Sequence, residues 1–315
     1  MLIARNARLT AACAIALTAC RAQGHEASPS PREDGVRVSD DIGRTVELPR
    51  PATRIAALSP GFVETLFAIG CGDAVILRDD RSDFPSPAVD AIPKTDGVQV
   101  SVRNVAGYTP DLVLLYADDG RFADDFARVH VPTAVLNPRT YDEVAGGIEK
   151  IGLLCGRKEA AARVSAAMRA AREKVAREID GARRPSVFIE IDATDPTRPW
   201  TAGTGSFVDE LLSLAGGRNA LTGLPSAYAQ VSAEAVIRAA PAVVLLVDDT
   251  GKVPAAAEEI RRRPGWAALP AIAAGRVVAG IDGDLLSRPG PRLADGLRAL
   301  AAALADRRSR DGGTP

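Results

Sequence analysis

The sequence predicts an α/β protein made of two Rossmann-like α/β lobes, joined by a single long α-helix. Three observations lead to this prediction. Apolar strands alternate with capped helices in both halves of the chain, as is typical of α/β lobes. One stretch of the first half recurs in the second half, and a long proline-free helical stretch separates the two. A chain of 315 residues is long enough for two hydrophobic cores.

The internal repeat pairs Ser101–Gly120 with Ser232–Gly251. Each copy reads as a helix, a turn marked by proline and a buried strand. The offset is constant along the match, because 232 minus 101 and 249 minus 118 both give 131. A constant offset favours two related lobes over a chance likeness between short α/β units.

The stretch from Lys158 to Gly181 is rich in Ala, Arg, Glu and Lys, which lose little side-chain entropy in a helix. Its large apolar residues form one narrow stripe, and the other faces are charged. We therefore predict a linking backbone helix over 157–182 that lies along a surface. The stripe consists of Val164, Met168, Val175 and Ile179.

The first lobe is predicted over 36–156. It opens with a small hairpin at 36–48, followed by a buried strand at 54–58. Ser59 is placed to N-cap the next helix and Pro60 suits its first turn. The free N–H groups at such a helix start can bind a polar or anionic ligand, although a plain strand–helix joint explains the pattern equally well. Further strands are expected at 74–77, 111–116 and 132–136.

The second lobe is predicted over 183–308. Strands are expected at 186–192, 243–247 and 276–279, and an amphipathic helix at 291–304 closes the lobe. The glycine-rich turn at 203–206 leads into a helix. It lacks the spacing of a dinucleotide fingerprint, so helix capping explains it.

The N-terminus is predicted to be a lipoprotein signal peptide over 1–19. Two arginines precede the apolar run Leu9–Ala19, which is too short to span a bilayer. The end of this run with the next residue, Leu17–Cys20, resembles the bacterial lipobox, which makes Cys20 the expected site of lipidation. The alternatives are an ordinary signal peptide or a buried apolar helix. Residues 20–35 are predicted to form a flexible tether and residues 309–315 a disordered tail.

The net charge, the cysteines and the histidines bear on nucleic-acid binding, on a possible disulfide and on metal binding. The net charge of −1 gives no support for a nucleic-acid partner. Cys71 and Cys155 each follow a predicted helix, and in an oxidising compartment they either form a disulfide or remain two separate buried thiols. With only two histidines, the chain has no ligand set for a bare transition metal.

The chain resembles the class III (cluster A) substrate-binding proteins of ABC importers, which carry cobalamin, haem or iron–siderophore complexes. The resemblance extends from about Gly43 to Leu304 and depends on several short motifs in a fixed order. It implies two α/β lobes joined by one long helix, with a ligand cleft between the lobes. It also implies a monomeric extracytoplasmic protein that delivers a metal–organic ligand to an ABC permease and ATPase. Such a protein is not an enzyme and has no catalytic residues and no intrinsic cofactor. The motifs are Ser59-Pro60, Glu64-Thr65-Leu66, Ser82-Asp83-Phe84-Pro85, Pro110-Asp111-Leu112-Val113, Gly203–Phe207, Gly216-Gly217-Arg218-Asn219, Val231-Ser232-Ala233-Glu234 and Pro289-Gly290-Pro291-Arg292.

The resemblance also implies ligand-binding residues. Trp200 and Tyr228 occupy second-lobe positions where cobalamin-binding members have aromatic residues, unless they are ordinary surface-loop anchors. At the first-lobe aromatic positions this chain has Arg81 and Gly97, which weakens the cobalamin assignment. Haem is disfavoured because Gly97-Val98 replaces the stretch that carries an axial tyrosine. The full expected set is Ser59, Pro60, Arg81, Phe84, Gly97, Trp200 and Tyr228.

A ferric siderophore is the alternative ligand. Arg78, Arg81 and Arg139 are expected in loops that border the cleft. They are suited to pair with an anionic siderophore, or with the phosphate and amide groups of a corrinoid.

In the family, one glutamate on each lobe pairs with arginines of the permease. Glu234 stands at the second-lobe position, but the first-lobe position holds Arg103. Either Asp142 or Glu143 substitutes, or docking is asymmetric, or the protein works without a standard permease.

Two other classes remain open. An envelope hydrolase would need a nucleophile and a base, but there is no G-x-S-x-G elbow, and His130 is the only histidine of the predicted folded region. A sensor or scaffold lipoprotein with the same lobes is the third hypothesis, and Arg103 supports it.

Overall fold

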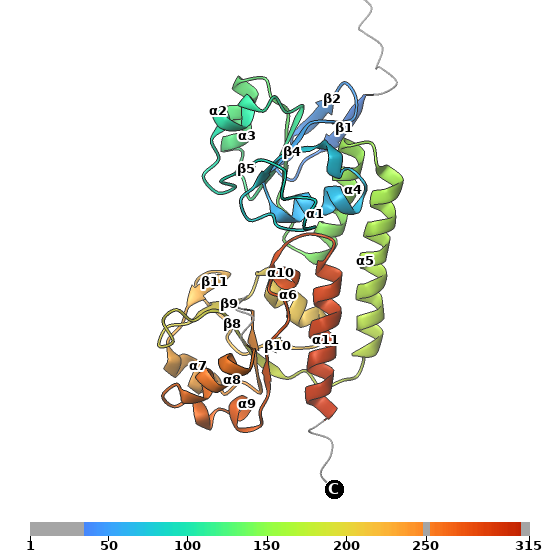
Figure 1. Cartoon of the computed structure of the whole chain (residues 1–315). Helices are drawn as coiled ribbons and strands as arrows, with labels where there is room; N and C mark the ends of the chain where they lie inside the picture. Colours follow the sequence, from blue (N-terminus) through green and yellow to red (C-terminus); the bar gives the residue numbers. More distant parts are fainter. Residues whose placement is uncertain (1–34, 248–252, 310–315) are drawn as a thin grey trace, which may run out of the picture. The chain divides into compact units, whose positions relative to one another are not determined.

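The computed structural model describes residues 35–247 and 253–309 (Figure 1). The described residues all belong to one compact unit. The predicted signal peptide, Cys20, the tether up to residue 34 and the tail beyond residue 309 lie outside them.

A parallel five-stranded sheet forms the first lobe, after a two-stranded antiparallel hairpin at Val36–Leu48. The strand order is β5-β4-β3-β6-β7, and every pairing is parallel. β3, β4, β6 and β7 are almost wholly buried, as a sheet covered on both faces requires, whereas the edge strand β5 is exposed or half-buried. The bounds are β1 Val36–Ser39, β2 Thr45–Leu48, β3 Ile55–Ala57, β4 Val75–Asp79, β5 Lys94–Thr95, β6 Leu112–Tyr116 and β7 Thr133–Leu136.

Helices connect these strands. α4 begins after Thr140, whose hydroxyl accepts a hydrogen bond from the Glu143 N–H. α1 begins at Pro60 with Ser59 at the N-cap position, as predicted, but the Ser59 side chain makes no capping hydrogen bond. The bounds are α1 Pro60–Ala68, the 3-10 helix η1 Gly72–Ala74, α2 Val102–Gly107, α3 Arg121–Arg128 and α4 Tyr141–Leu154.

The second sheet is mixed. Its strands lie in the order β11-β9-β8-β12-β13, and β10 also pairs with β8. β9 runs antiparallel to β8 because a short connection returns the chain directly beside it, and β11 is antiparallel to β9. The bounds are β8 Ser186–Asp192, β9 Trp200–Ala202, β10 Arg218–Asn219, β11 Tyr228–Gln230, β12 Val243–Leu246 and β13 Val277–Val278.

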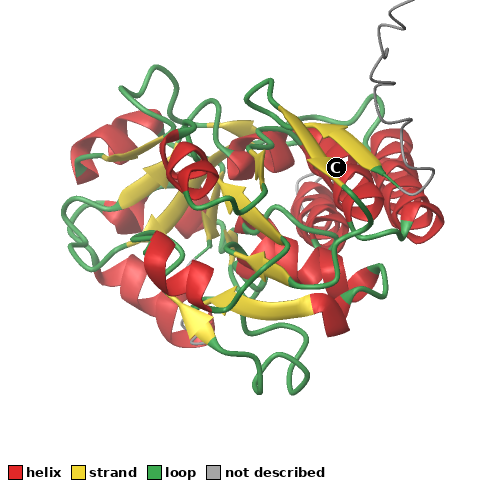
Figure 2. Cartoon of the chain, turned by 90° about the horizontal axis from the view of Figure 1, so that it is seen from above, coloured by secondary structure: helices red, strands yellow, loops and turns green. Residues whose placement is uncertain are grey.

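Helices also connect most strands of this second lobe. Figure 2 shows the helices and strands of the described chain from above, in separate colours. α6 starts at the glycine-rich turn, where the Ser206 hydroxyl accepts from the Asp209 N–H. Capping therefore accounts for that turn, as predicted. The bounds are α6 Phe207–Leu214, α7 Ala233–Ala239, α8 Val253–Arg262, the 3-10 helix η2 Trp266–Ala268, α9 Pro270–Ala273, α10 Asp284–Ser287 and α11 Leu293–Ser309.

The internal repeat corresponds to equivalent elements. α2 and β6 in the first lobe match α7 and β12 in the second. Ser101 and Ser232 cap the two helices in the same way, each accepting from the N–H three residues on.

The predicted linking helix is α5, Lys158–Glu178, which packs against α4, α6 and α11 (Figure 1). Its buried stripe contains Met168 and Val175 as predicted, but Val164 and Ile179 are only partly buried. Small residues complete the stripe because α4 lies very close: a Cβ on Gly152 would lie 2.2 Å from the Cβ of Ala161.

The first lobe also contacts the segment before α11. A Cβ on Gly61 of α1 would lie 2.3 Å from the carbonyl oxygen of Pro289. Beside this contact, Glu64 is buried and accepts two hydrogen bonds from Arg292, at 3.0 and 2.7 Å. The close backbone contact and the ion pair fix α1 against the C-terminal segment.

Candidate functional site

The candidate site begins at the carboxyl edge of the first sheet. The parallel strands β3, β4, β6 and β7 all end there, so the loops that follow them meet at one edge. In open α/β sheets ligands bind outside these strand ends. The residues at or just beyond them include Ser59, Arg81, Tyr116 and Asn137.

Ser59 and Pro60 lie between β3 and α1. Ser59 is buried and Pro60 is half-buried. Pro289 packs against Gly61, which lies in the same helical turn as Pro60. Pro289 therefore covers part of the start of α1. Ser59 and Pro60 therefore mainly shape this part of the sheet edge and expose few hydrogen-bond donors to a ligand.

Arg81 and Gly97 belong to two neighbouring loops. The positive charge of Arg81 contributes to lowering the pKa of Asp96, after the larger effect of the Gln99 and Val98 N–H groups. Gly97 is required by close packing, because a Cβ there would lie 2.6 Å from the Cβ of Asp79. Arg81 is exposed, so its charge is accessible at this edge.

Phe84 is a partly exposed aromatic ring in the loop after β4. The Arg292 guanidinium lies 4.1 Å from its ring centroid. The adjacent Asp83 accepts a hydrogen bond from Arg288 at 2.6 Å, which lowers the pKa of Asp83. Two arginines from the second half of the chain therefore position this loop.

The second sheet presents Trp200 and Tyr228 on its antiparallel strands β9 and β11. Tyr228 pairs with Ala202, and Gln230 pairs with Trp200, so the two aromatic rings lie diagonally on one face. They are 41% and 43% exposed, whereas the intervening residues Thr201 and Ala229 are buried. Such a pair of exposed rings on one face suits a large flat ligand.

Tyr116 is a partly exposed aromatic residue at the carboxyl edge of the first sheet, and sequence reasoning missed it. It ends β6 and is 37% exposed. Burial raises the pKa of Tyr116, with a smaller electrostatic contribution from Tyr228. Burial also raises the pKa of Tyr228, so both phenols are neutral donors at physiological pH. The available signal was an aromatic residue at the end of a buried strand in a chain with few aromatics.

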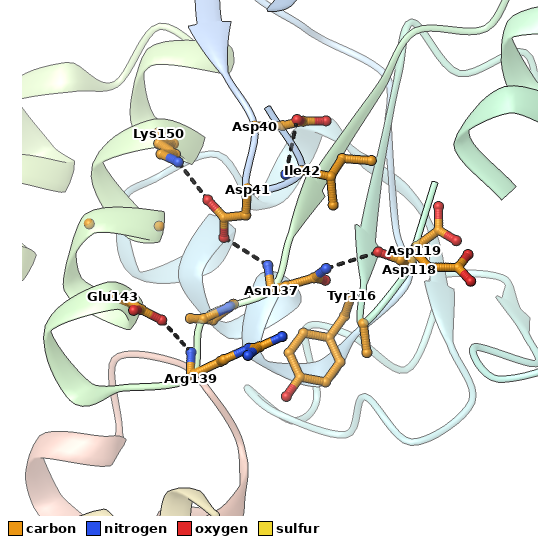
Figure 3. A pocket seen from close by; sticks show the side chains of 14 residues that line it. Asp40, Asp41, Ile42, Tyr116, Asp118, Asp119, Asn137, Arg139, Glu143 and Lys150 are labelled. Carbon is orange, nitrogen blue, oxygen red and sulfur yellow. Dashed lines mark hydrogen bonds and ion pairs between the residues drawn. The ribbon is translucent and has the colours of Figure 1, made fainter. Parts of the chain in front are cut away.

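A cavity of about 890 Å³ opens beside Tyr116 (Figure 3). It lies among the β1–β2 turn, the ends of β6 and β7, and α4. Gly146 and Gly147 leave open space on the α4 side, since a Cβ on either would meet nothing within 4 Å. The lining residues are Asp40, Asp41, Ile42, Tyr116, Ala117, Asp118, Asp119, Asn137, Pro138, Arg139, Glu143, Gly146, Gly147 and Lys150.

Most of the charged groups around this cavity already have partners. Lys150 lies 2.5 Å from Asp41, whose carboxylate also accepts from the Asn137 N–H at 2.7 Å (Figure 3). Asn137 donates through its side-chain nitrogen to the Asp118 carbonyl at 2.9 Å. Its Oδ1 is buried and has no hydrogen-bond partner among the described residues. A ligand amide or hydroxyl would satisfy this acceptor.

The other sequence-predicted arginines differ in their surroundings. Arg78 is buried and donates to the carbonyls of Val89 and Ser82, so it supports the loop after β4 and does not border a ligand site. Arg139 is exposed and lines the cavity, as expected of a residue that contacts ligand.

Arg103 and Glu234 lie away from this site, in the first turns of the equivalent helices α2 and α7. Each lines a separate pocket. Asp142, a candidate substitute for the first-lobe glutamate, pairs with Arg172, and Glu143 accepts from the Arg139 N–H.

Cys71 and Cys155 are free, buried and adjacent. The Cys71 thiol donates to the Cys155 carbonyl across 3.4 Å. The contact between the two side chains lowers the pKa of Cys71 and, together with burial, raises that of Cys155.

Within residues 35–247 and 253–309, no three His, Cys, Asp or Glu side chains are grouped so as to hold a metal ion. The same residues include no helix with both the length and the apolar character needed to cross a bilayer.

Residues 55–282 match the family model described as periplasmic binding protein, which covers both sheets and the helix between them. The chain belongs to the periplasmic binding protein family.

Two relatives extend over most of the chain. An uncharacterized ABC transporter substrate-binding lipoprotein of Bacillus subtilis is 27% identical over 278 residues, which are 85% of each protein. A vitamin B12-binding protein of Pectobacterium carotovorum is 24% identical over 244 residues, covering 76% of this chain and 84% of the relative.

Solved structures share the fold. The vitamin B12-binding protein of Vibrio cholerae superposes with a TM-score of 0.72 at 23% identity, over 82% of this chain and 98% of that one. A periplasmic heme-binding protein in complex with two hemes gives 0.71 at 26% identity, over 80% and 98%. A protein of an Fe³⁺-hydroxamate transport system from Saccharomonospora viridis gives 0.69 at 24% identity, over 85% and 98%. The expected class III two-lobed fold is confirmed.

Proposed function

We propose that this protein is an extracytoplasmic, lipid-anchored substrate-binding protein of an ABC importer. It captures a metal–organic complex, with a corrinoid such as cobalamin favoured, and delivers it to a permease. Family membership and the substrate-binding lipoprotein of Bacillus subtilis support the transport role. The lipobox ending at Cys20 supports the anchor, which the Cys20→Ser variant tests: it should lose labelling by radioactive palmitate.

The observation that carries the ligand proposal is the set of exposed aromatic rings on both lobes. Trp200 and Tyr228 share one face of the second sheet, and Tyr116 is partly exposed at the end of β6 in the first. Aromatic rings on two sides give a macrocycle large apolar contact at little entropic cost. Tyr116 supplies the first-lobe aromatic that Arg81 and Gly97 do not.

The polar cavity beside Tyr116 suits the periphery of a corrinoid. Amide groups both donate and accept hydrogen bonds. Asn137 offers an unpaired acceptor there, and Arg139 offers an exposed donor. A ligand with an apolar face and an amide-rich edge matches both parts of the site.

A ferric siderophore is the second candidate, favoured by one observation. Arg81 and Arg139 are both exposed at the carboxyl edge of the first sheet, where they suit an anionic ligand. Haem is disfavoured because Gly97 and Val98 supply no axial ligand at the expected loop.

Tryptophan fluorescence tests the proposal, because the chain has two tryptophans and only Trp200 is exposed, whereas Trp266 is buried. Cyanocobalamin, cobinamide, haem and a ferric hydroxamate are titrated into the mature protein and into Trp200→Phe. Saturable quenching by the corrinoids, weakened in the variant, supports the proposal. Saturable quenching by the ferric hydroxamate alone would identify the ligand as a siderophore complex. No saturable binding of any probe would refute the transport role.

A further inference from the structure

The cavity beside the partly exposed ring of Tyr116 has more negative than positive groups in its walls (Figure 3). Five carboxylates and two basic side chains line it. Because charges in a binding site attract opposite charges of a ligand and repel like ones, this imbalance affects which ligand groups can enter. The carboxylates are those of Asp40, Asp41, Asp118, Asp119 and Glu143, and the basic side chains are those of Arg139 and Lys150.

Two of the five carboxylates are neutralised within the protein. Asp40 accepts two hydrogen bonds from the Arg44 guanidinium, at 3.1 and 2.9 Å. Asp41 pairs with the Lys150 ammonium across 2.5 Å. These two pairs leave three carboxylates in the lining against one further cation, Arg139.

The other three carboxylates accept hydrogen bonds from backbone N–H groups, which carry no formal charge. Asp118 accepts from two of them at the start of α3, and Asp119 and Glu143 each accept from one. With Arg44 counted, five carboxylates stand against three cations, which is an excess of two negative charges. Asn137 Oδ1 adds a further acceptor, because it is buried without a partner among the described residues. The cavity therefore has both acceptors and negative charge in excess.

We propose that this cavity selects the ligand by charge. It admits an edge of the ligand that carries amide N–H groups or a positive charge, and it rejects carboxylate and phosphate groups. Ionised carboxylates accept hydrogen bonds and donate none, so they bind N–H donors and cations and repel anions. This inference rests on the proposed function, under which the cavity holds the amide-rich edge of a corrinoid.

A phosphate group of the same ligand has to lie outside the cavity. Arg81 is exposed at the carboxyl edge of the first sheet and does not line the cavity. The charge selection therefore fixes the orientation of a bound cobalamin. Its amide edge lies beside Asp119 and Glu143, and its nucleotide phosphate lies toward Arg81.

Ligands that differ by a single charged group test the selection. In the b-, d- and e-monocarboxylic acids of cyanocobalamin, one peripheral amide is replaced by a carboxylate and the rest of the molecule is unchanged. In calorimetric titrations of the mature protein, at least one of these acids should bind about fivefold or more weakly than cyanocobalamin. The difference should shrink at high ionic strength, because salt screens partly exposed charges. Equal affinity for cyanocobalamin and all three acids would overturn the proposal.

Neutral replacements in the cavity separate the effect of charge from that of shape. Asp119→Asn and Glu143→Gln each keep an oxygen that can accept the backbone N–H bound by the carboxylate. The double variant should reduce the discrimination against the carboxylate to about twofold or less. Asp73→Asn, an exposed position outside the cavity lining, should leave the discrimination in place. Full discrimination by the double variant would contradict selection by charge.

A second pair of ligands distinguishes this inference from the choice of a corrinoid. Ferrioxamine B carries a free ammonium group, and its N-acetyl derivative is neutral. If cyanocobalamin and cobinamide do not bind but ferrioxamine B binds about fivefold more tightly than the acetyl derivative, the corrinoid proposal is wrong and the charge selection stands. If the corrinoids do not bind and the two ferrioxamines bind equally or not at all, both proposals are wrong.

Discussion

Replacing Glu64 by Gln removes the negative charge at the contact between α1 and the C-terminal segment. The Glu64 side chain is 2% exposed, and its partners Arg288 and Arg292 are 14% and 18% exposed. Losing one partner of a buried ion pair costs about 3–5 kcal/mol. Because the arginines keep Asp83, Asp282 and Asp284 as alternative partners, the lower end, about 3 kcal/mol, is expected here.

Thermal unfolding followed by circular dichroism measures this effect. In a protein of this size about 3 kcal/mol corresponds to a fall in Tm of about 6–12 °C. The control is Glu47→Gln, which breaks an ion pair with Arg37 whose side chains are 64% and 75% exposed. That exposed pair contributes about 0–1 kcal/mol, so its Tm should fall by less than about 4 °C. If Glu64→Gln lowered Tm no more than the control does, the inferred role of this contact would be wrong.

Three further predictions concern the site and the fold. Trp200→Ala should weaken corrinoid binding by about 2 kcal/mol, or about 30-fold in the Kd, measured by calorimetric titration; an unchanged Kd would exclude Trp200 from the site. A Gly-Gly insertion after Arg169 in α5 should leave both lobes folded by circular dichroism yet weaken ligand binding, whereas unchanged affinity would make α5 a mere linker. Cys71 and Cys155 should form a disulfide in protein secreted to an oxidising compartment, and alkylation of both thiols under denaturing, non-reducing conditions would contradict this.

Local sequence signals predicted the elements of the fold well. Ser206, at the turn that helix capping was predicted to explain, accepts a hydrogen bond from the N–H three residues on, as a helix N-cap does. Thr140 makes the same bond, and so do Ser101 and Ser232, which were not singled out as caps. These interactions involve neighbours in sequence, so residue type and spacing reveal them. Ser59 looked the same in sequence but makes no such bond, because Pro60 and the tight packing of Gly61 on Pro289 set that turn.

Packing between segments that are distant in the sequence could not be predicted from local residue patterns. The stripe on α5 seemed to need its large apolar residues, yet Ala161 and Ser165 complete it, because α4 lies close to α5 at Gly152. The second sheet is mixed because the short β9 pairs with β8 in the antiparallel direction. Hydrophobic periodicity alone does not reveal which strands pair.

The candidate site was predicted in part. The family resemblance pointed to Trp200 and Tyr228, which share one sheet face. It could not supply Tyr116, because the exposure of this ring at the end of the otherwise buried β6 depends on how the loops around it fold. Nor could it show that the Arg78 guanidinium is buried and donates to the backbone carbonyls of Val89 and Ser82, since these contacts form only when the loop after β4 is folded.

In the proposed function one ligand contacts aromatic residues of both lobes. This is tested by calorimetric titration of cobinamide and cyanocobalamin into the mature protein, Tyr116→Ala, Tyr228→Ala and the double variant. We expect binding that each single change weakens, with a coupling energy of about 0.5 kcal/mol or more between the two tyrosines. Corrinoid binding that neither change affects, or no corrinoid binding to the unmodified protein, would contradict it.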